Sequence, residues 1–492
     1  MIRSTLSWPR QIISYRNNHL MNQHFNRRSF LEKLGVGCAA VGTTSLLSGI
    51  TNLGLINAAA AANRSIYMPA TSNYKAVVCL MLSGGNDSFN MLTPKGDPEY
   101  QEYADVRSNL AIDKESLREI NPTNNIGKQL GLHPNLENVQ TLFETGKAAF
   151  IANIGALVEP TTLSKFMNGQ VQVPLGLFSH SDQKLHWQTS IPQDRNANGW
   201  GGRLADILHT NNSNQNISMN ISLDGINTFQ RGNIITEYAI QAGQGAVSIS
   251  GSNSNDFYNT LKRQTLDSML EASYQNIFEQ AYAGTISDST TNAIEFAAAL
   301  AQGDPISTSF GTDSLSQKLK SIAQVMAARE PLGMSNQTFF VQQNGYDNHD
   351  NNIEDHGILM ADLDTAIGSF YAALEELQIE NDVVIFTASD FARKLVSNGN
   401  GSDHAWGGNA LVIGGNINGK QIYGNYPDLY LGNDLDAGNG RILPTISCDE
   451  LFAEMALWMG ASSADLFQIL PNIDRFWSPV PTAGPLGLLP IT

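Results

Sequence analysis

Several polar segments of the sequence gather carboxylate, imidazole and hydroxyl side chains close to apolar runs. They read "SGGNDSFNMLTP", "FSHSDQ", "GYDNHDN" and "TASDFARKLVSNGNGSDH". The candidate site residues within them are Asp87, Ser179, His180, Asp347, His349, Asp390, Arg393, Asp403 and His404. Carboxylates and imidazoles bind divalent cations, and a hydroxyl beside such cations can attack an ester. This combination predicts a hydrolytic site with one or two divalent ions, and mixed Asp/His ligation favours Zn or Mn over Ca.

The spacing within these segments supports the same chemistry, although each segment also has a simpler explanation. Asp347 and His349 lie two residues apart, so on an extended segment both side chains point to one side and can share a metal ion. Ser179 precedes a predicted helix, whose free N–H groups favour an anion, but a serine there is also a common N-cap. Asp390 and His404 lie in a Gly/Asn-rich loop, where turn chemistry alone accounts for such residues.

The elements that must position these residues are apolar runs with the length and β-branched content of strands buried on both faces. They are residues 76–82, 148–154, 338–342, 382–387 and 410–413. Between them lie helical patterns, most clearly at residues 358–378. The alternation predicts an α/β fold with a doubly wound, mostly parallel sheet. Ligands of such sheets bind beyond the carboxyl ends of the strands, where the polar segments lie.

Residues 255–330 differ from the rest of the chain, because they are rich in Gln, Ala and Ser and have a helical pattern without a strand pattern. We interpret them as a helical insertion or cap on one domain that spans residues 63–492. "SISGSNSND", residues 248–256, is the predicted linker into this insertion.

The N-terminal 62 residues are typical of an export signal. Arg27-Arg28-Ser29-Phe30-Leu31 precedes a mildly apolar stretch that ends in "NAAAAAN", and the paired arginines resemble a twin-arginine signal. A membrane-spanning helix is the alternative for residues 34–62, but five glycines and several Ser/Thr favour cleavage near Ala62. The chain could start at Met1 or Met21. We expect a periplasmic or extracellular protein with no stable membrane anchor and with the twin-arginine translocase as its partner during export.

The negative charge of the chain argues against nucleic acids and anionic lipid surfaces as partners. Residues 1–62 contain six Lys/Arg and one Glu, so the remaining chain has 23 basic and 45 acidic residues, a net charge of −22. Such a surface repels the phosphates of nucleic acids and of anionic lipids. Cys79 and Cys448 remain, without the spacing of a zinc knuckle, and the sequence leaves open whether they pair.

The same polar segments, together with "GLHPNL", "GWGGRL" and "PTISCDELFAEMALWMG", closely resemble the exported family named domain of unknown function 1501. That family looks like a branch of the alkaline phosphatase and sulfatase superfamily. The resemblance extends from about Lys75 to the C-terminus. It implies an alkaline phosphatase-like fold, with Ser179 as nucleophile and with the metal ligands Asp87, Asp347, His349, Asp390 and His404.

One departure from the superfamily pattern affects the implied ligands. Where that pattern has Asp-His at the end of a strand, this chain reads Asp390-Phe391, and a phenyl ring cannot bind a metal ion. Asp403 could fill the gap. Arg393 could instead offer a guanidinium fork to an anion, with His180 helping to position the ester.

Our leading interpretation is an exported metal-dependent hydrolase of phosphate or sulfate esters, on a small molecule or on a polymer. The alternative is a catalytically silent periplasmic binding protein that keeps the phosphatase-like fold. A metal-free Ser-His-Asp site that uses His180 is a third interpretation, which the adjacency of Ser179 and His180 disfavours.

Overall fold

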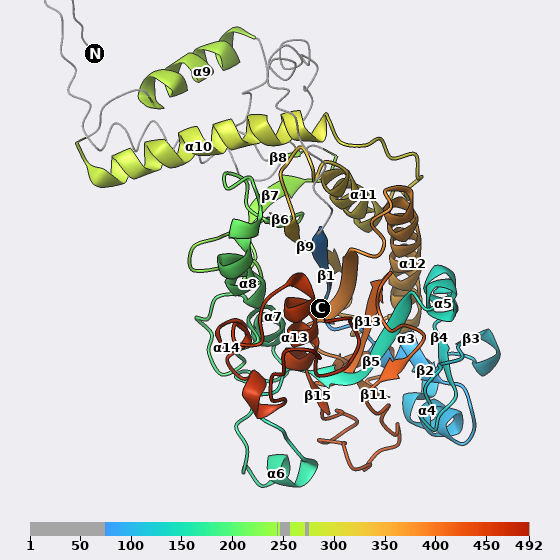
Figure 1. Ribbon diagram of the computed structural model, residues 1–492. Helices are drawn as coiled ribbons and strands as arrows, with labels where there is room; N and C mark the ends of the chain where they lie inside the picture. The colour runs from blue at the N-terminus through green and yellow to red at the C-terminus, as the bar shows by residue number, and fades with distance from the viewer. Residues whose placement is uncertain (1–73, 244, 247–255, 271–274, 492) are drawn as a thin grey trace, which may run out of the picture.

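The computed structural model describes residues 74–243, 245–246, 256–270 and 275–491. The predicted export signal and all but the last residue of the predicted linker lie outside these residues. The described chain folds around a ten-stranded sheet with helices on both faces (Figure 1). The predicted α/β class with a mostly parallel sheet is therefore confirmed.

The central sheet has the strand order β14-β5-β13-β10-β1-β9-β6-β7-β8, and β15 also pairs with β5. Its strands are β1 (Lys75–Ser83), β5 (Ala148–Gly155), β6 (Asn220–Ser222), β7 (Tyr238–Gln241), β8 (Gly245–Ala246), β9 (Asn336–Asn344), β10 (Val383–Ser389), β13 (Gly408–Gly414), β14 (Ile422–Tyr423) and β15 (Ile446–Ser447). At the centre, β1 runs parallel to both β9 and β10. The register pairs Ser83 with Asn344 and Leu82 with Ser389, so these three strands end side by side.

One predicted parallel strand has the opposite direction. β13, which contains the apolar run 410–413, is antiparallel to both β10 and β5. Residues 390–407 connect β10 to β13 and form the hairpin β11 (Arg393–Ser397) and β12 (Ser402–His404) instead of a helix. Parallel strands are usually joined by a helical crossover, whereas this connection is a hairpin and the chain returns antiparallel.

The two faces of the sheet carry separate cores, because successive strand residues point to opposite sides. On one face, Val78 and Leu80 of β1 belong to a core that also includes side chains of α5 (Glu137–Glu144), α11 (Ser314–Ala327) and α12 (Asn352–Glu376). On the other, Val77 and Met81 belong to a core shared with α8 (Trp200–Leu208), α13 (Cys448–Met459) and α14 (Leu466–Ile469). Burial on both faces explains why the strands read as continuous apolar runs.

The remaining elements lie around this three-layer body. They are the helices α3 (Ser88–Met91), α4 (Glu99–Arg107), α6 (Leu163–Met167), α7 (His180–Thr189), α9 (Phe257–Leu270) and α10 (Ile277–Leu300) and the small sheet β2 (Leu92–Pro94), β4 (Leu130–Leu132) and β3 (Arg118–Glu119). Short 3-10 turns are 108–110, 114–116, 209–211 and 473–475.

The stretch predicted as a helical insertion holds α9, α10 and α11. α9 and α10 lie beyond the β7–β8 end of the sheet, whereas α11 packs beside α12 in the core (Figure 1). Among the described residues, α12 is the one helix that is long and apolar enough to cross a membrane. Half of its 18-residue apolar stretch is buried inside the protein. Cys79 in β1 and Cys448 in α13 are both buried free thiols, and burial raises the pKa of each.

Candidate metal centre

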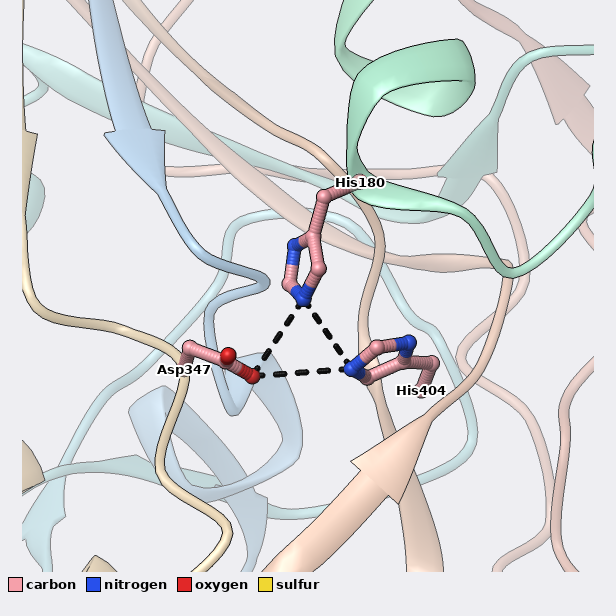
Figure 2. Close-up of side chains that lie close together, drawn as sticks. All are labelled: His180, Asp347 and His404. Carbon is pink, nitrogen blue, oxygen red and sulfur yellow. Dashed lines mark hydrogen bonds and ion pairs between the residues drawn. The ribbon is translucent and has the colours of Figure 1, made fainter.

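Side chains from three distant segments meet beyond the carboxyl ends of β1, β9 and β10. His180 is the first residue of α7, Asp347 lies three residues after β9, and His404 ends β12. Figure 2 shows the three side chains pointing toward one another. His180 Nε2 lies 3.0 Å from His404 Nε2 and 3.3 Å from Asp347 Oδ1, and His404 Nε2 lies 3.5 Å from the same oxygen.

The hydrogen bonds of Nδ1 determine the protonation of Nε2 in His180 and His404. His180 Nδ1 lies 2.9 Å from Asp390 Oδ2, and His404 Nδ1 lies 2.8 Å from the carbonyl oxygen of Phe178. A carboxylate and a carbonyl only accept, so each Nδ1 carries the proton and each neutral Nε2 presents a lone pair. Two lone pairs and a carboxylate oxygen thus converge, an arrangement that a cation stabilises.

His349 adds a fourth donor to what we call the His/Asp cluster (His180, Asp347, His349 and His404). Its Nε2 lies 2.9 Å from His404 Nε2 and 3.0 Å from Asp347 Oδ1, and its Nδ1 lies 3.5 Å from Asp403 Oδ1. Ligand atoms 2.0–2.1 Å from a tetrahedral Zn²⁺ are separated by about 3.3 Å. The spacing of His180, Asp347 and His404 therefore fits three ligands of one tetrahedral ion, and His349 lies beside two of them.

Hydrogen bonds, neighbouring charges and burial shift the pKa values of three residues in the cluster. The hydrogen bond to Asp390 raises the pKa of His180, although partial burial opposes it. Burial would raise the pKa of Asp347, but the hydrogen bond and charge of Arg393 outweigh it and the pKa is lowered. Burial also lowers the pKa of His404. Without an ion, a proton is therefore held more readily by His180 than by His404.

Asp390 and Asp403, both predicted as ligands, lie behind the imidazoles. Asp390 is buried and holds His180, while its Oδ1 has no hydrogen-bond partner among the described residues. The hydrogen bond from Lys394 Nζ, 2.9 Å from Asp403 Oδ2, lowers the pKa of Asp403. In these positions the two carboxylates orient His180 and His349 and leave their Nε2 atoms toward the cluster.

Arg393, expected as an anion-binding fork, is completely buried. Its Nε and Nη1 donate to the carbonyl oxygens of Gly85 and Ser402, at 2.9 and 2.8 Å. Its Nη2 donates to the carbonyl oxygens of Gly84 and Tyr346 and, at 2.6 Å, to Asp347 Oδ1. Every guanidinium nitrogen is thus engaged within the protein, and Arg393 fixes Asp347 and the surrounding loops.

Asp87 lies apart from the cluster, although it follows β1 as predicted. Its carboxylate is buried, forms a close ion pair with Arg107, and accepts a 2.8 Å hydrogen bond from Asn352. The paired glycines before it allow a close approach of this loop to the site. A Cβ on Gly84, which has φ +119°, would lie 2.5 Å from the backbone nitrogen of Asp347.

Phe391, the departure from the superfamily pattern, packs directly on the imidazoles. Its ring centroid lies 4.5 Å from that of His404 and 4.7 Å from that of His180, and its side chain is buried. A Cβ on Gly85 would lie 2.3 Å from this ring, so the glycine makes room for it. The phenyl group thus restricts the orientation of two imidazoles.

Ser179 occupies the N-cap position of α7. Its Oγ lies 3.1 Å from Ser181 Oγ, and its hydrogen bond to Asp182 contributes to a lowered pKa of that carboxyl, behind the larger effect of Arg195. His180, which we expected to position the ester, instead points into the cluster. The sequence also offered no spacing signal for Phe178 or Arg107, whose partners are distant along the chain.

A second histidine pair, His133 and His356, lies buried near Asp87, with ring centroids 5.6 Å apart. Burial lowers the pKa of His356 to about 4 and that of His133 to about 3. The unfolded chain binds these protons more readily, so the free energy of unfolding should fall as the pH drops from about 6.5 toward 4. The loss from His356 alone is on the order of 3 kcal/mol.

Replacing His356 by Gln tests this dependence, because the amide can still donate to Asn86 Oδ1, which lies 2.9 Å from His356 Nε2. Urea unfolding of wild type and of His356→Gln between pH 4 and 7 should show a shallower pH dependence for the variant. Equal slopes would mean that the buried histidine does not titrate in this range.

Comparisons of the structure found distant similarities to solved structures. The PsFucS1 sulfatase from Pseudoalteromonas sp. has a TM-score of 0.33 at 9% identity, over 79% of this chain and 68% of that one. The C-terminal periplasmic domain of EcEptC from Escherichia coli, in complex with Zn, has a TM-score of 0.29 at 8% identity, over 69% and 73%. No curated protein matches the sequence.

The family comparison covers most of the described chain. The family model described as "Protein of unknown function (DUF1501)" matches residues 74–469, which include the whole His/Asp cluster and its supporting loops. The family that the sequence motifs predicted is thereby confirmed, and this chain belongs to the DUF1501 family.

Proposed function

We propose that the protein is a metal-dependent hydrolase of phosphate or sulfate esters. One divalent ion, Zn or Mn, would be held by His180, Asp347 and His404, with His349 as a fourth ligand. The convergence of two imidazole lone pairs and a carboxylate oxygen within 3.0–3.5 Å carries this proposal. The same three atoms all lie within 4.8 Å of one another, as ligands of a single ion must.

A bound divalent ion would act as a Lewis acid on an ester oxygen. The chain's own residues prepare that site. Asp390 and the Phe178 carbonyl keep a proton on Nδ1 of His180 and His404, and Arg393 holds the carboxylate of Asp347 in place. Ser179 is next to the ligand His180 and is the candidate nucleophile, but its hydroxyl would have to give up its contact with Ser181 to reach an ester at the cluster.

The side chains of the cluster are accessible, since Asp347 is 49% and His349 44% exposed. An accessible cluster accommodates an ester on a polymer as well as one on a small molecule. We further propose that the protein acts in the periplasm or outside the cell after export. Fractionation of cells that produce the full chain tests this, and a cytoplasmic mature protein would contradict it.

Metal removal tests the proposed function directly. Because an ion that binds only the folded state stabilises it by RT ln(1 + [L]/Kd), chelation should lower the melting temperature, and Zn or Mn should restore it. At a ligand concentration of 100 Kd the stabilisation is about 2.7 kcal/mol. Elemental analysis should find one ion per chain, and hydrolysis of p-nitrophenyl phosphate or p-nitrophenyl sulfate should stop on chelation. Full activity in metal-free protein would contradict the proposal.

A catalytically silent binding protein is the second candidate, and specific observations favour it. Phe391 stands where a ligand was expected and packs on His404, and Asp87 is ion-paired with Arg107. A protein that binds one ion and hydrolyses neither ester, whereas it still binds inorganic phosphate, would support this candidate.

A further inference from the structure

Two cationic side chains next to the cluster already have hydrogen-bond partners within the protein. The guanidinium of Arg393 is fully bonded inside the protein, and Lys394 Nζ is paired with Asp403. An ester with an anionic head, bound at the ion, would still present oxygens that need donors. A further cationic side chain beside the cluster would supply them.

Arg441 lies against the same cluster from a different loop. Its Nε donates to the carbonyl oxygen of His404 at 3.2 Å, and its guanidinium carbon lies 4.8 Å from the ring centroid of Phe178, whose carbonyl holds His404 Nδ1. Its Nη1 donates to the carbonyl oxygen of Gly438 at 3.2 Å. In the described part of the chain, Nη2 has no protein acceptor, and the side chain is half-buried.

The turn that precedes Arg441 has a conformation fixed by glycines and by hydrogen bonds. Gly438, Asn439 and Gly440 all have positive φ, at +110°, +57° and +71°, and Asp436 Oδ1 accepts hydrogen bonds from the backbone nitrogens of Gly438 and Gly440. A Cβ on Gly440 would lie 2.8 Å from the Cβ of Leu395 in β11, so the turn packs closely on the hairpin that carries His404. The guanidinium is therefore presented by a preorganised turn, which lowers the entropy cost of binding a ligand.

We propose that Arg441 binds the tetrahedral oxyanion of the substrate, a phosphate or sulfate group, beside the His/Asp cluster. This inference rests on the proposed function and assigns the recognition of its anionic group to one residue. Nη2 supplies the hydrogen bonds, while Nε, Nη1 and the Phe178 ring hold the guanidinium in place. Planar guanidinium groups match such oxyanions in geometry and charge.

Calorimetric titration of the mature chain with inorganic phosphate, and separately with sulfate, tests the inference. Arg441→Gln should raise the Kd of the preferred anion at least tenfold, and Arg441→Lys should have a smaller effect because it keeps the charge. Arg329→Gln is the matched control. Arg329 also lies over a ring, that of Tyr74 at 5.7 Å, and donates to a carbonyl, that of Met326, but at the opposite end of β1.

The preference between phosphate and sulfate identifies the class of ester. Metal content is measured on the same samples. If wild type binds no metal, the proposed function fails, and this outcome is distinguished from a failure of the inference on Arg441. The inference is overturned if wild type binds neither anion. It is also overturned if Arg441→Gln binds the anion within twofold of wild type and of Arg329→Gln at equal metal content.

Discussion

Replacing His404 by Gln is expected to lower the affinity for Zn or Mn by more than 100-fold and to abolish ester hydrolysis. His404 Nε2 is within 3.5 Å of each of the other three donor atoms, so its loss removes the centre of the cluster. Losses in the outer hydrogen-bonding shell of metal sites already cost about 10- to 100-fold, and the loss of a ligand should cost more.

The metal affinities of further variants distinguish metal ligands from the residues that hold the ligands in place. Asp390→Asn removes the carboxylate that holds His180 Nδ1 but leaves Nε2 in place, so metal affinity should fall by about 10- to 100-fold instead of being lost. His209→Gln is the control histidine, because His209 is buried near Gln215 and does not belong to the cluster. Metal titration of the purified variants provides the measurement. If His404→Gln and His209→Gln retained the same metal content, the cluster would not be a metal site.

Replacing Asp87 by Ala is expected to destabilise the protein by about 3–5 kcal/mol while leaving its metal content unchanged. Asp87 and Arg107 are both buried, at 1% and 0% exposure, so the variant would leave the guanidinium without its counter-charge. Urea unfolding in the presence of the metal measures the free energy of unfolding.

The exposed ion pair of Asp97 with Lys114 offers a matched control. Its atoms lie 2.7 Å apart, but Asp97 is 64% exposed, so Asp97→Ala should cost less than about 1 kcal/mol. A loss of metal in Asp87→Ala, without the loss of stability, would show instead that Asp87 is a ligand, as the family resemblance implied.

The sequence by itself was sufficient to predict the central strands of the sheet and the edge at which the candidate site lies. The apolar runs of β1, β5, β9 and β10 identify strands because burial on both faces favours consecutive apolar residues. Since the carboxyl ends of β1, β9 and β10 meet, the polar residues after them lie at one edge of the sheet. This is why Asp347, His349 and His404 could be grouped before their side chains were seen.

The start of α12 and the direction of β13 could not be predicted from the sequence. α12 begins at Asn352, six residues before the predicted start, because its first turn is polar and lacks apolar periodicity. β13 reverses direction because of the connection before it and not because of its composition.

Only the tertiary structure decided which of the polar side chains face one another. Asp87, which was expected as a metal ligand, pairs with Arg107, and His180, which was expected to position the ester, lies in the cluster. Asp87 is drawn to Arg107, twenty residues away, whereas His180 is turned toward His404 by Asp390 and by the unusual backbone of Phe178, with φ +73°. Side-chain direction depends on loop dihedral angles and on counter-charges that come from distant segments. Neither has a periodic signature in the sequence, so the roles of Arg393, Phe391 and Arg441 required the folded chain.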